Sequence, residues 1–196
     1  MHVFQKLLAI ILIIFLSPLL VSIAGLILVL NGSPVLFRAN RAGKNGKRFL
    51  FYKFRTMSNI GATDVDSLDD ELRITRLGSF LRKSSIDELP SLINIVKGEM
   101  VFVGPRPLLM EYLPLYNKEQ IRRHEVLPGI TGLAQISGRN AISWEEKFRL
   151  DVWYVDNQYI LLDIEIILKT IFKVLKRDGI SQEGHATMPV FRGENK

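Results

Sequence analysis

Two adjacent carboxylates, Asp87 and Glu88, lie in the segment SSIDELP at positions 84–90. Neighbouring residues of a helix point about 100° apart, so these two side chains cannot act as a symmetrical pair on one atom. A carboxylate at the start of a helix stays ionised at neutral pH. That state suits a nucleophile or an oxygen ligand for Mg²⁺ better than it suits a general acid. The segment is therefore a candidate for nucleophilic or metal-dependent chemistry.

The same segment also has a purely structural interpretation. Ser85 and Glu88 have the spacing of a capping box, in which the two side chains satisfy backbone N–H groups at the start of a helix. Asp87 is favoured there by the helix dipole, and Pro90 is tolerated because a first turn leaves N–H groups without partners. Taken alone, the segment favours this structural interpretation over the chemical one.

More positive charge surrounds the two carboxylates than they need for neutralisation. Arg82 comes shortly before Asp87, and Arg106 follows between Pro105 and Pro107. The two prolines fix the backbone on both sides of Arg106 and restrict the directions of its guanidinium. An arginine held in this way can bind phosphate through two parallel hydrogen bonds, although Pro-Arg-Pro also suits a stiff surface turn. Cations and a metal are what phosphoryl transfer requires, so the pattern indicates a polyanionic substrate.

Length and composition limit the class of protein. The chain has 196 residues, enough for one domain with a core and a short additional element. Its formal net charge of +6 favours anionic lipid surfaces, phosphates or nucleic acid as neighbours without choosing among them. The absence of cysteine excludes disulfides, zinc–thiolate sites and cysteine nucleophiles, and the 3 histidines are too scattered to indicate a metal site.

An uncharged apolar stretch of about 24 residues, 7–30, opens the chain and would reach roughly 36 Å as a helix, enough to cross a hydrocarbon core of about 30 Å. Ser17 and Pro18 lie near its middle. Pro18 has no N–H for the carbonyl of Ile14, so the helix must kink or break, and the Ser17 hydroxyl can satisfy a carbonyl freed there. These residues favour a kinked span and leave a re-entrant hairpin as the alternative.

Residues 48–57, RFLFYKFRTM, are typical of a strand. The alternation of side chains places Lys53 and Arg55 on one face. This face is either the basic decoration of an edge strand, which the strand alone favours, or a pair of cations that meets an anionic ligand.

Helical patterns occur later in the chain. Residues 90–97 read as a helix that Gly98 ends, and a second capping box, Ser143 with Glu146, begins a helix that runs to about position 155. Residues 164–177 form a basic amphipathic helix, which either packs on the core or binds at a membrane surface. The predicted fold class is α+β and rich in helix.

Several ordered motifs resemble the bacterial sugar transferase family, and within it the small monotopic phosphoglycosyl transferases of the PglC type. The motifs are Ser17-Pro18, YKFRTM, LRKSSIDELPSLINIVKGEMVFVGPRPLL, EYLPLYNKEQ, PGITGLAQISGRNAISW and KVLKRDGISQEGH. The resemblance extends over nearly the whole chain. It implies a re-entrant helix-break-helix membrane anchor (1–33), a small catalytic domain of short strands and amphipathic interfacial helices (34–185) and a polar tail (186–196).

The resemblance also implies a reaction. A sugar-1-phosphate would move from a UDP-sugar to undecaprenyl phosphate with release of UMP, in two steps through a covalent phosphosugar-aspartate and with Mg²⁺. The PglC type implies N,N'-diacetylbacillosamine as the sugar, as the first membrane step of protein N-glycosylation. The alternative is the same reaction on UDP-GlcNAc or UDP-GalNAc for surface polysaccharide, and a non-catalytic membrane adaptor is a function of another class.

By motif, the resemblance makes Asp87 the nucleophile and a metal contact, with Glu88 assisting the metal or the acceptor. Arg82 and Arg106 would hold phosphates. The other residues implied for the same cleft are Lys53, Arg139 and Asp163.

The resemblance reverses the preference for a kinked span. Ser17-Pro18 matches the family's helix-break-helix, so a re-entrant hairpin with both ends in the cytoplasm becomes the expectation. The implied location is the cytoplasmic face of the bacterial inner membrane. The implied partners are membrane lipids and downstream glycosyltransferases, and no nucleic acid is expected.

Overall fold

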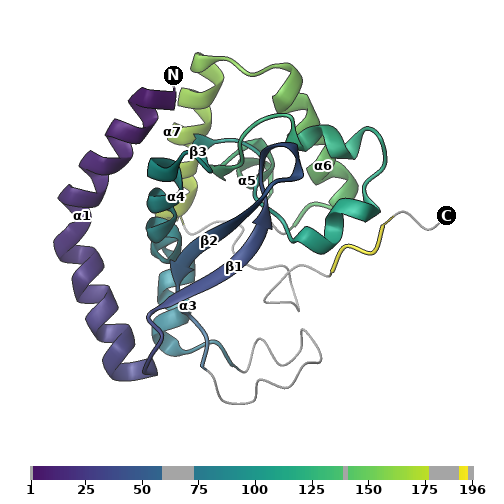
Figure 1. Cartoon of the computed structure of the whole chain (residues 1–196). Coiled ribbons are helices and arrows are strands. Elements are labelled where there is room, and N and C mark those ends of the chain that lie inside the picture. The colour runs from purple at the N-terminus through teal and green to yellow at the C-terminus, as the bar shows by residue number, and fades with distance from the viewer. Residues whose placement is uncertain (1, 59–72, 139–140, 177–189, 194–196) are drawn as a thin grey trace.

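The computed structural model describes residues 2–58, 73–138, 141–176 and 190–193. It is rich in helix and has two small sheets, which confirms the α+β class. Figure 1 shows the long helix α1 along one side of the shorter helices and the strands. In chain order the elements are α1 His2–Asn31, β1 Leu36–Ala42, η1 Lys44–Gly46, β2 Arg48–Phe54, α3 Arg76–Lys83, η2 Ile86–Ser91, α4 Leu92–Lys97, β3 Val101–Val103, η3 Met110–Leu115, η4 Gln120–His124, β4 Gly129–Thr131, α5 Leu133–Ser137, α6 Trp144–Asp156 and α7 Ile160–Lys176, where η denotes a 3-10 helix.

Helix α1 continues through Pro18 without interruption. The hydroxyl of Ser17 donates a hydrogen bond of 2.7 Å to the carbonyl of Ile14, the group for which Pro18 has no N–H. Ser22 in turn donates to the carbonyl of Pro18 at 2.8 Å. The predicted role of Ser17 is therefore confirmed. A re-entrant hairpin is not shown, since α1 forms one bowed helix (Figure 1).

Both halves of α1 pack against the same domain. In the first half, Ala9 is fully buried among residues of β2 and α4, and the Gln5 side chain accepts a hydrogen bond of 3.1 Å from the N–H of Phe102. In the second half, Ile23 and Ile27 are buried against β2 and α3. Among the described residues, α1 is the one helix long and apolar enough to cross a membrane. Most of its large apolar side chains are nevertheless exposed.

Arg55 connects the end of α1 to the end of β2. Its buried guanidinium donates hydrogen bonds to the carbonyls of Asn31, Gly32 and Ser33, the last at 3.0 Å. The end of a helix leaves its last carbonyls without helical donors, and the helix dipole favours a cation there. The interpretation of Arg55 as a ligand cation on the same face as Lys53 is therefore wrong, because β2 ends one residue earlier and the Arg55 side chain is used by α1.

Replacing Arg55 with methionine is expected to lower the free energy of unfolding by about 2 kcal/mol, because three carbonyls lose a charged donor. Thermal unfolding in detergent micelles measures the loss. The control is Arg48→Met, which removes an exposed arginine at the start of β2. A loss no larger than the control's would show that Arg55 does not secure the end of α1.

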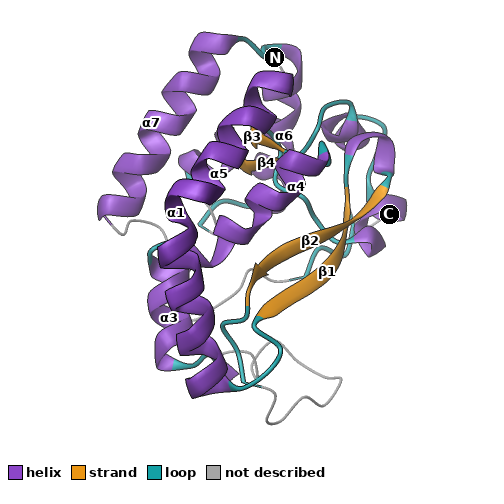
Figure 2. Ribbon diagram, turned by 60° about the vertical axis from the view of Figure 1, so that its left-hand side comes forward, coloured by secondary structure: helices purple, strands orange, loops and turns teal. Residues whose placement is uncertain are grey.

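The strands form two separate sheets (Figure 2). β1 and β2 make an antiparallel hairpin, and β3 pairs with β4 in parallel. The predicted strand is thus confirmed as β2. The fully buried Asn94 of α4 donates to the carbonyl of Leu50 at 2.8 Å and accepts from the N–H of Tyr52 at 3.3 Å. This amide fixes α4, and with it the preceding η2, against β2.

Candidate active site

The SSIDELP segment forms the 3-10 helix η2 and not a capped helix start. Ser85 has a left-handed backbone, with φ of 56° and ψ of 14°, and its side chain makes no capping hydrogen bond. The predicted capping box at Ser85 is therefore wrong. The second capping serine is confirmed, since Ser143 accepts a hydrogen bond of 3.2 Å from the N–H of Glu146. A left-handed residue other than glycine costs about 1 kcal/mol or more, and such positions cluster at functional sites.

Glu88 and Arg106 form a bidentate ion pair. Nη1 of Arg106 donates to Oε2 of Glu88 at 3.2 Å, and Nη2 donates to Oε1. The Glu88 side chain is 18% exposed and the Arg106 side chain 44% exposed. The tertiary fold thus brings the arginine of the Pro-Arg-Pro turn directly to the carboxylate pair, with part of its guanidinium open to solvent.

Asp87 is buried, with 5% of its surface exposed. Burial is the main cause that raises the pKa of its carboxyl to about 6, and the charge of Glu88 raises it further, while Lys53, Arg106 and Arg82 lower it. A carboxyl whose pKa lies below 7 is more than half ionised at neutral pH. Asp87 therefore keeps the predicted ionised state at neutral pH, but with a pKa much closer to neutrality, because a buried site disfavours the charge.

Lys53 of β2 and Arg82 of α3 complete the set of cations around Asp87. Burial and then the charge of Arg82 lower the pKa of Lys53, and the two carboxylates oppose this. Nε of Arg82 donates to the Thr56 hydroxyl at 2.9 Å, which holds the guanidinium just beyond the end of β2. The structure thus brings together five predicted site residues from separate parts of the chain, namely Lys53, Arg82, Asp87, Glu88 and Arg106.

A sixth predicted cleft residue, Asp163, is not in this cluster. Asp163 on α7 accepts a hydrogen bond of 2.7 Å from the Tyr154 hydroxyl, and burial raises the pKa of Asp163. Tyr154 also donates to the carbonyl of Val103 at 3.0 Å, so Asp163 belongs to a pocket beside β3. Arg139 lies outside the described residues.

Sequence reasoning missed three charged residues associated with Arg106. Lys147 on α6 has its pKa lowered to about 8 by burial first and next by the charge of Arg106. Arg123 of η4 and Asp151 of α6 form a buried ion pair of 2.7 Å. A signal for this pair existed in the sequence. Asp151 follows the apolar Phe148 by three residues, on the buried face of its helix, where a carboxylate requires a partner.

His124 is buried next to this ion pair and makes stability depend on pH. Its Nδ1 lies 3.0 Å from the carbonyl of Gly43. Burial and then the charge of Arg123 lower the pKa of His124 to about 4. Between about pH 6.5 and pH 4 the unfolded chain therefore binds a proton that the folded chain does not. His124 is expected to remove up to about 3 kcal/mol of stability as the pH falls through this range.

Urea unfolding of the wild type and His124→Asn, followed from pH 7 to pH 4, measures this effect. Asparagine keeps a side-chain N–H for the carbonyl of Gly43 but does not titrate. The variant is expected to gain stability relative to the wild type as the pH falls. A constant difference between the two proteins across the range would contradict the assignment to His124.

A sequence model of bacterial sugar transferases matches residues 1–177. The chain belongs to the bacterial sugar transferase family. The predicted resemblance is thus confirmed at the level of the family, and the Asp87 cluster lies within the matched part of this sugar transferase. The sequence is 57% identical over 162 residues to the uncharacterized sugar transferase EpsL of Bacillus subtilis, a match that covers 83% of this chain and 80% of that protein.

Two longer relatives have names that describe a reaction. The undecaprenyl-phosphate galactose phosphotransferase of Salmonella typhimurium is 39% identical over 166 residues, which cover 76% of this chain and 35% of that protein. The UDP-glucose:undecaprenyl-phosphate glucose-1-phosphate transferase of Xanthomonas campestris pv. campestris is 39% identical over 182 residues, which cover 87% of this chain and 38% of that protein. This sugar transferase therefore spans little more than a third of the length of either.

Proposed function

We propose that this sugar transferase moves a sugar-1-phosphate from a UDP-sugar to undecaprenyl phosphate and releases UMP. The observation that carries the proposal is a buried, mostly ionised Asp87 surrounded by Lys53, Arg82 and Arg106. A carboxylate in this state can attack phosphorus, and fixed cations stabilise the negative charge on the transferred group. The names of the Salmonella and Xanthomonas relatives support the same reaction class.

The proposed reaction has two balanced steps. In the first, an oxygen of Asp87 forms a bond to the phosphorus that bears the sugar, and the bond from this phosphorus to the UMP oxygen breaks, so the electron pair leaves with UMP. In the second, a phosphate oxygen of the acceptor attacks the same phosphorus and releases the Asp87 carboxylate. Arg106 and Arg82 bind the phosphate oxygens, and Glu88 holds the Arg106 guanidinium in its direction.

Mg²⁺ fits this site as an ion shared between protein and substrate. The described residues contain no group of three or more side chains that could form a complete protein metal site. Both oxygens of Glu88 are engaged by Arg106, whereas no described residue donates a hydrogen bond to the Asp87 carboxylate. Asp87 would therefore be the protein ligand, as Mg²⁺ commonly uses one or two carboxylates with substrate phosphates. The bound ion would neutralise charge on the diphosphate.

We propose that the protein lies on the cytoplasmic face of the bacterial inner membrane without crossing it. The Gln5 end and the Ile27 end of α1 both contact the same charged domain, so they cannot lie on opposite sides of a bilayer while that domain stays in water. A re-entrant hairpin, bent at Ser17 and Pro18, is the form of α1 that we propose in lipid. An N-terminal tag labelled from the periplasm of intact cells would contradict this topology.

Helix α7 supports the same membrane position. The predicted amphipathic helix buries only Leu162 and Ile166 among its apolar side chains. All the others except the half-buried Val174 are exposed, which favours a membrane surface over the core as its partner. Its exposed apolar residues are Ile160, Leu161, Ile164, Ile167, Leu168, Ile171, Phe172 and Leu175.

The transferred sugar is a separate part of the proposal. The PglC-type resemblance favours N,N'-diacetylbacillosamine, whereas the names of two relatives give galactose and glucose. The relatives' names favour UDP-galactose or UDP-glucose as the donor, with UDP-GlcNAc and UDP-GalNAc as further alternatives. Product carried on the lipid would pass to downstream glycosyltransferases.

UMP release by the purified protein in lipid nanodiscs tests the proposal. UDP-glucose, UDP-galactose, UDP-GlcNAc, UDP-GalNAc and UDP-N,N'-diacetylbacillosamine are compared, each with and without undecaprenyl phosphate. Multiple turnovers that need both the acceptor and one donor are expected, and EDTA is expected to stop them. No UMP from any of the five donors would overturn the proposal and favour a membrane adaptor.

A further inference from the structure

We propose that Arg123 and Asp151 form a positioning pair that holds the phosphate-binding Arg106 in place through its main chain. The inference rests on the proposed role of Arg106 in phosphate binding. Neither residue contacts Asp87 in the described contacts, so both would act through Arg106.

The pair is fully enclosed. Oδ2 of Asp151 accepts from Nε of Arg123 at 3.0 Å and from its Nη2 at 2.7 Å. The two side chains are 1% and 2% exposed. A buried ion pair is not by itself a strong source of stability, because both charges lose their water. The Arg123 guanidinium is planar and presents several N–H groups in fixed directions. This indicates that the pair positions the groups around it.

The same guanidinium reaches the turn that carries Arg106. Nη2 of Arg123 donates to the main-chain carbonyl of Arg106 at 2.8 Å. Pro105 and Pro107 have no N–H, so the turn depends on its carbonyls for anchoring. The carbonyl of Pro105 accepts from the N–H of Gly129 at 3.0 Å, and that of Arg106 accepts from Arg123. A chain of contacts therefore runs from α6 through η4 to the arginine that binds Glu88.

Aromatic rings restrict the Arg123 side chain further. Its guanidinium carbon lies 5.9 Å from the centre of the Tyr116 ring and 5.6 Å from that of Phe148. The two rings also contact each other, with their centres 5.2 Å apart, so the guanidinium packs beside an aromatic pair and gains cation–π contact with both rings. Movement of the Arg106 carbonyl would therefore have to disturb a packed side chain and its ion pair.

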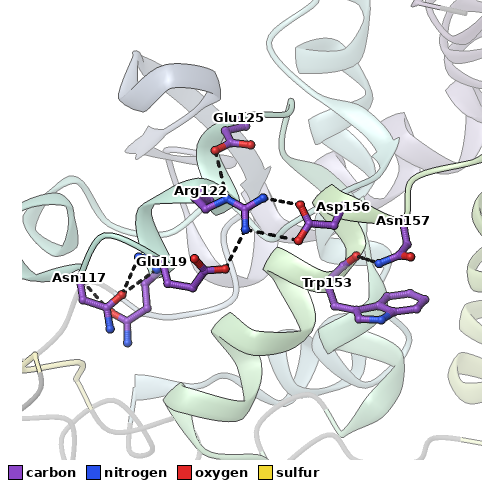
Figure 3. A network of polar contacts seen from close by, with 8 residues as sticks. Asn117, Glu119, Arg122, Glu125, Trp153, Asp156 and Asn157 are labelled. Carbon is purple, nitrogen blue, oxygen red and sulfur yellow. Dashed lines mark hydrogen bonds and ion pairs between the residues drawn. The ribbon is translucent and has the colours of Figure 1, made fainter.

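The neighbouring Arg122 supplies a matched comparison. Figure 3 shows its guanidinium on the outside of η4, where it pairs with Glu119 at 2.8 Å, with Glu125 at 3.4 Å and with Asp156 of α6. It thus joins the same two elements as Arg123 but does so at the surface. None of these three ion pairs involves the turn that carries Arg106, so loss of Arg122 should leave that turn in place.

The test replaces both members of the buried pair at once, by Arg123→Met with Asp151→Leu, so that no single charge is left buried. With UDP-glucose or whichever UDP-sugar the wild type uses, and with enzyme in excess, UMP release is expected to fall about 30-fold. The melting temperature is expected to stay within about 5 °C of the wild type. Arg122→Gln is expected to stay within about two-fold of the wild-type rate. Arg123→Lys, which keeps the charge but loses the planar fork, should lose about 10-fold with unchanged melting.

A double-mutant cycle with Arg106→Ala distinguishes positioning from general support of the fold. If the pair acts through Arg106, adding the two substitutions to Arg106→Ala slows release by less than about two-fold. A full further loss of about 30-fold would overturn the inference, as would wild-type rates in both the double variant and Arg123→Lys. Failure of the proposed function would be distinct, because the wild type itself would then release no UMP.

Discussion

Replacing Asp87 with asparagine is expected to lower the rate of UMP release by at least about 10³-fold, because the amide cannot form the bond to phosphorus. The fold should persist, since asparagine has nearly the same shape and carries no charge in a buried position. The measurement is UMP release in nanodiscs, with circular dichroism on the same samples. Asp156→Asn, at an exposed carboxylate on α6, is the matched control and should keep the wild-type rate.

A trapping experiment examines the same prediction by its chemistry. UDP-sugar labelled in the sugar is incubated with the protein without acceptor, and the label is then located by peptide mass spectrometry. A sugar phosphate on the peptide that contains Asp87 is expected for the wild type and none for Asp87→Asn. Full UMP release by Asp87→Asn, or trapped label on another residue, would refute the role of Asp87 as nucleophile.

Replacing Gly78 with alanine is expected to lower the free energy of unfolding by about 4 kcal/mol and the rate of UMP release about 100-fold. A Cβ at this position would lie 1.9 Å from the carbonyl oxygen of Thr56, a main-chain atom that cannot swing aside. Helix α3 would have to move away from the end of β2. Arg82 would move with it and lose its hydrogen bond to the Thr56 hydroxyl. The rate of UMP release should therefore fall together with the stability of the fold.

Gly25→Ala is the control for this effect. Gly25 lies in α1, and a Cβ there would meet nothing within 4 Å. Alanine has the higher helix propensity, so this variant should equal or exceed the wild type by up to about 1 kcal/mol. Thermal unfolding in detergent and UMP release are measured for both variants. Equal melting temperatures for Gly78→Ala and Gly25→Ala would show that α3 is not packed tightly against β2.

Features that depend on residues close together in the chain were predicted well. The aromatic-rich alternating pattern correctly predicted the strand β2. Gly98 ends α4 as predicted, with a left-handed backbone of φ 80°. The Ser17 hydroxyl donates a hydrogen bond to the carbonyl of Ile14, for which the adjacent Pro18 has no N–H. Such contacts involve a few neighbouring residues, so residue type and spacing alone determine them.

Contacts between distant parts of the chain were predicted in part. Motif resemblance named Lys53, Arg82 and Arg106 as companions of Asp87, and the structure places all three around it. It also named Asp163, which instead binds Tyr154. Spacing carries no information on which of several distant charges share a cleft, because that depends on how the helices and strands pack.

The two Ser-x-x-Glu segments show most clearly the difference between what local spacing predicts and what tertiary contacts decide. Their spacing is the same, and each was predicted to cap a helix. Ser143 does so, since its side chain accepts a hydrogen bond from the N–H of Glu146. At Ser85 the backbone is left-handed and Glu88 binds Arg106, eighteen residues further along the chain.

The sequence alone therefore determined that two carboxylates and several arginines were available for phosphate chemistry beside an apolar, proline-containing helix. The tertiary structure decided that Asp87 is buried and that Glu88 forms an ion pair with Arg106. It also decided that Arg55 donates hydrogen bonds to the carbonyls at and just after the end of α1. The physical reason is that burial and long-range ion pairs change both the charge state and the direction of a side chain, and neither is set by its neighbours in the chain.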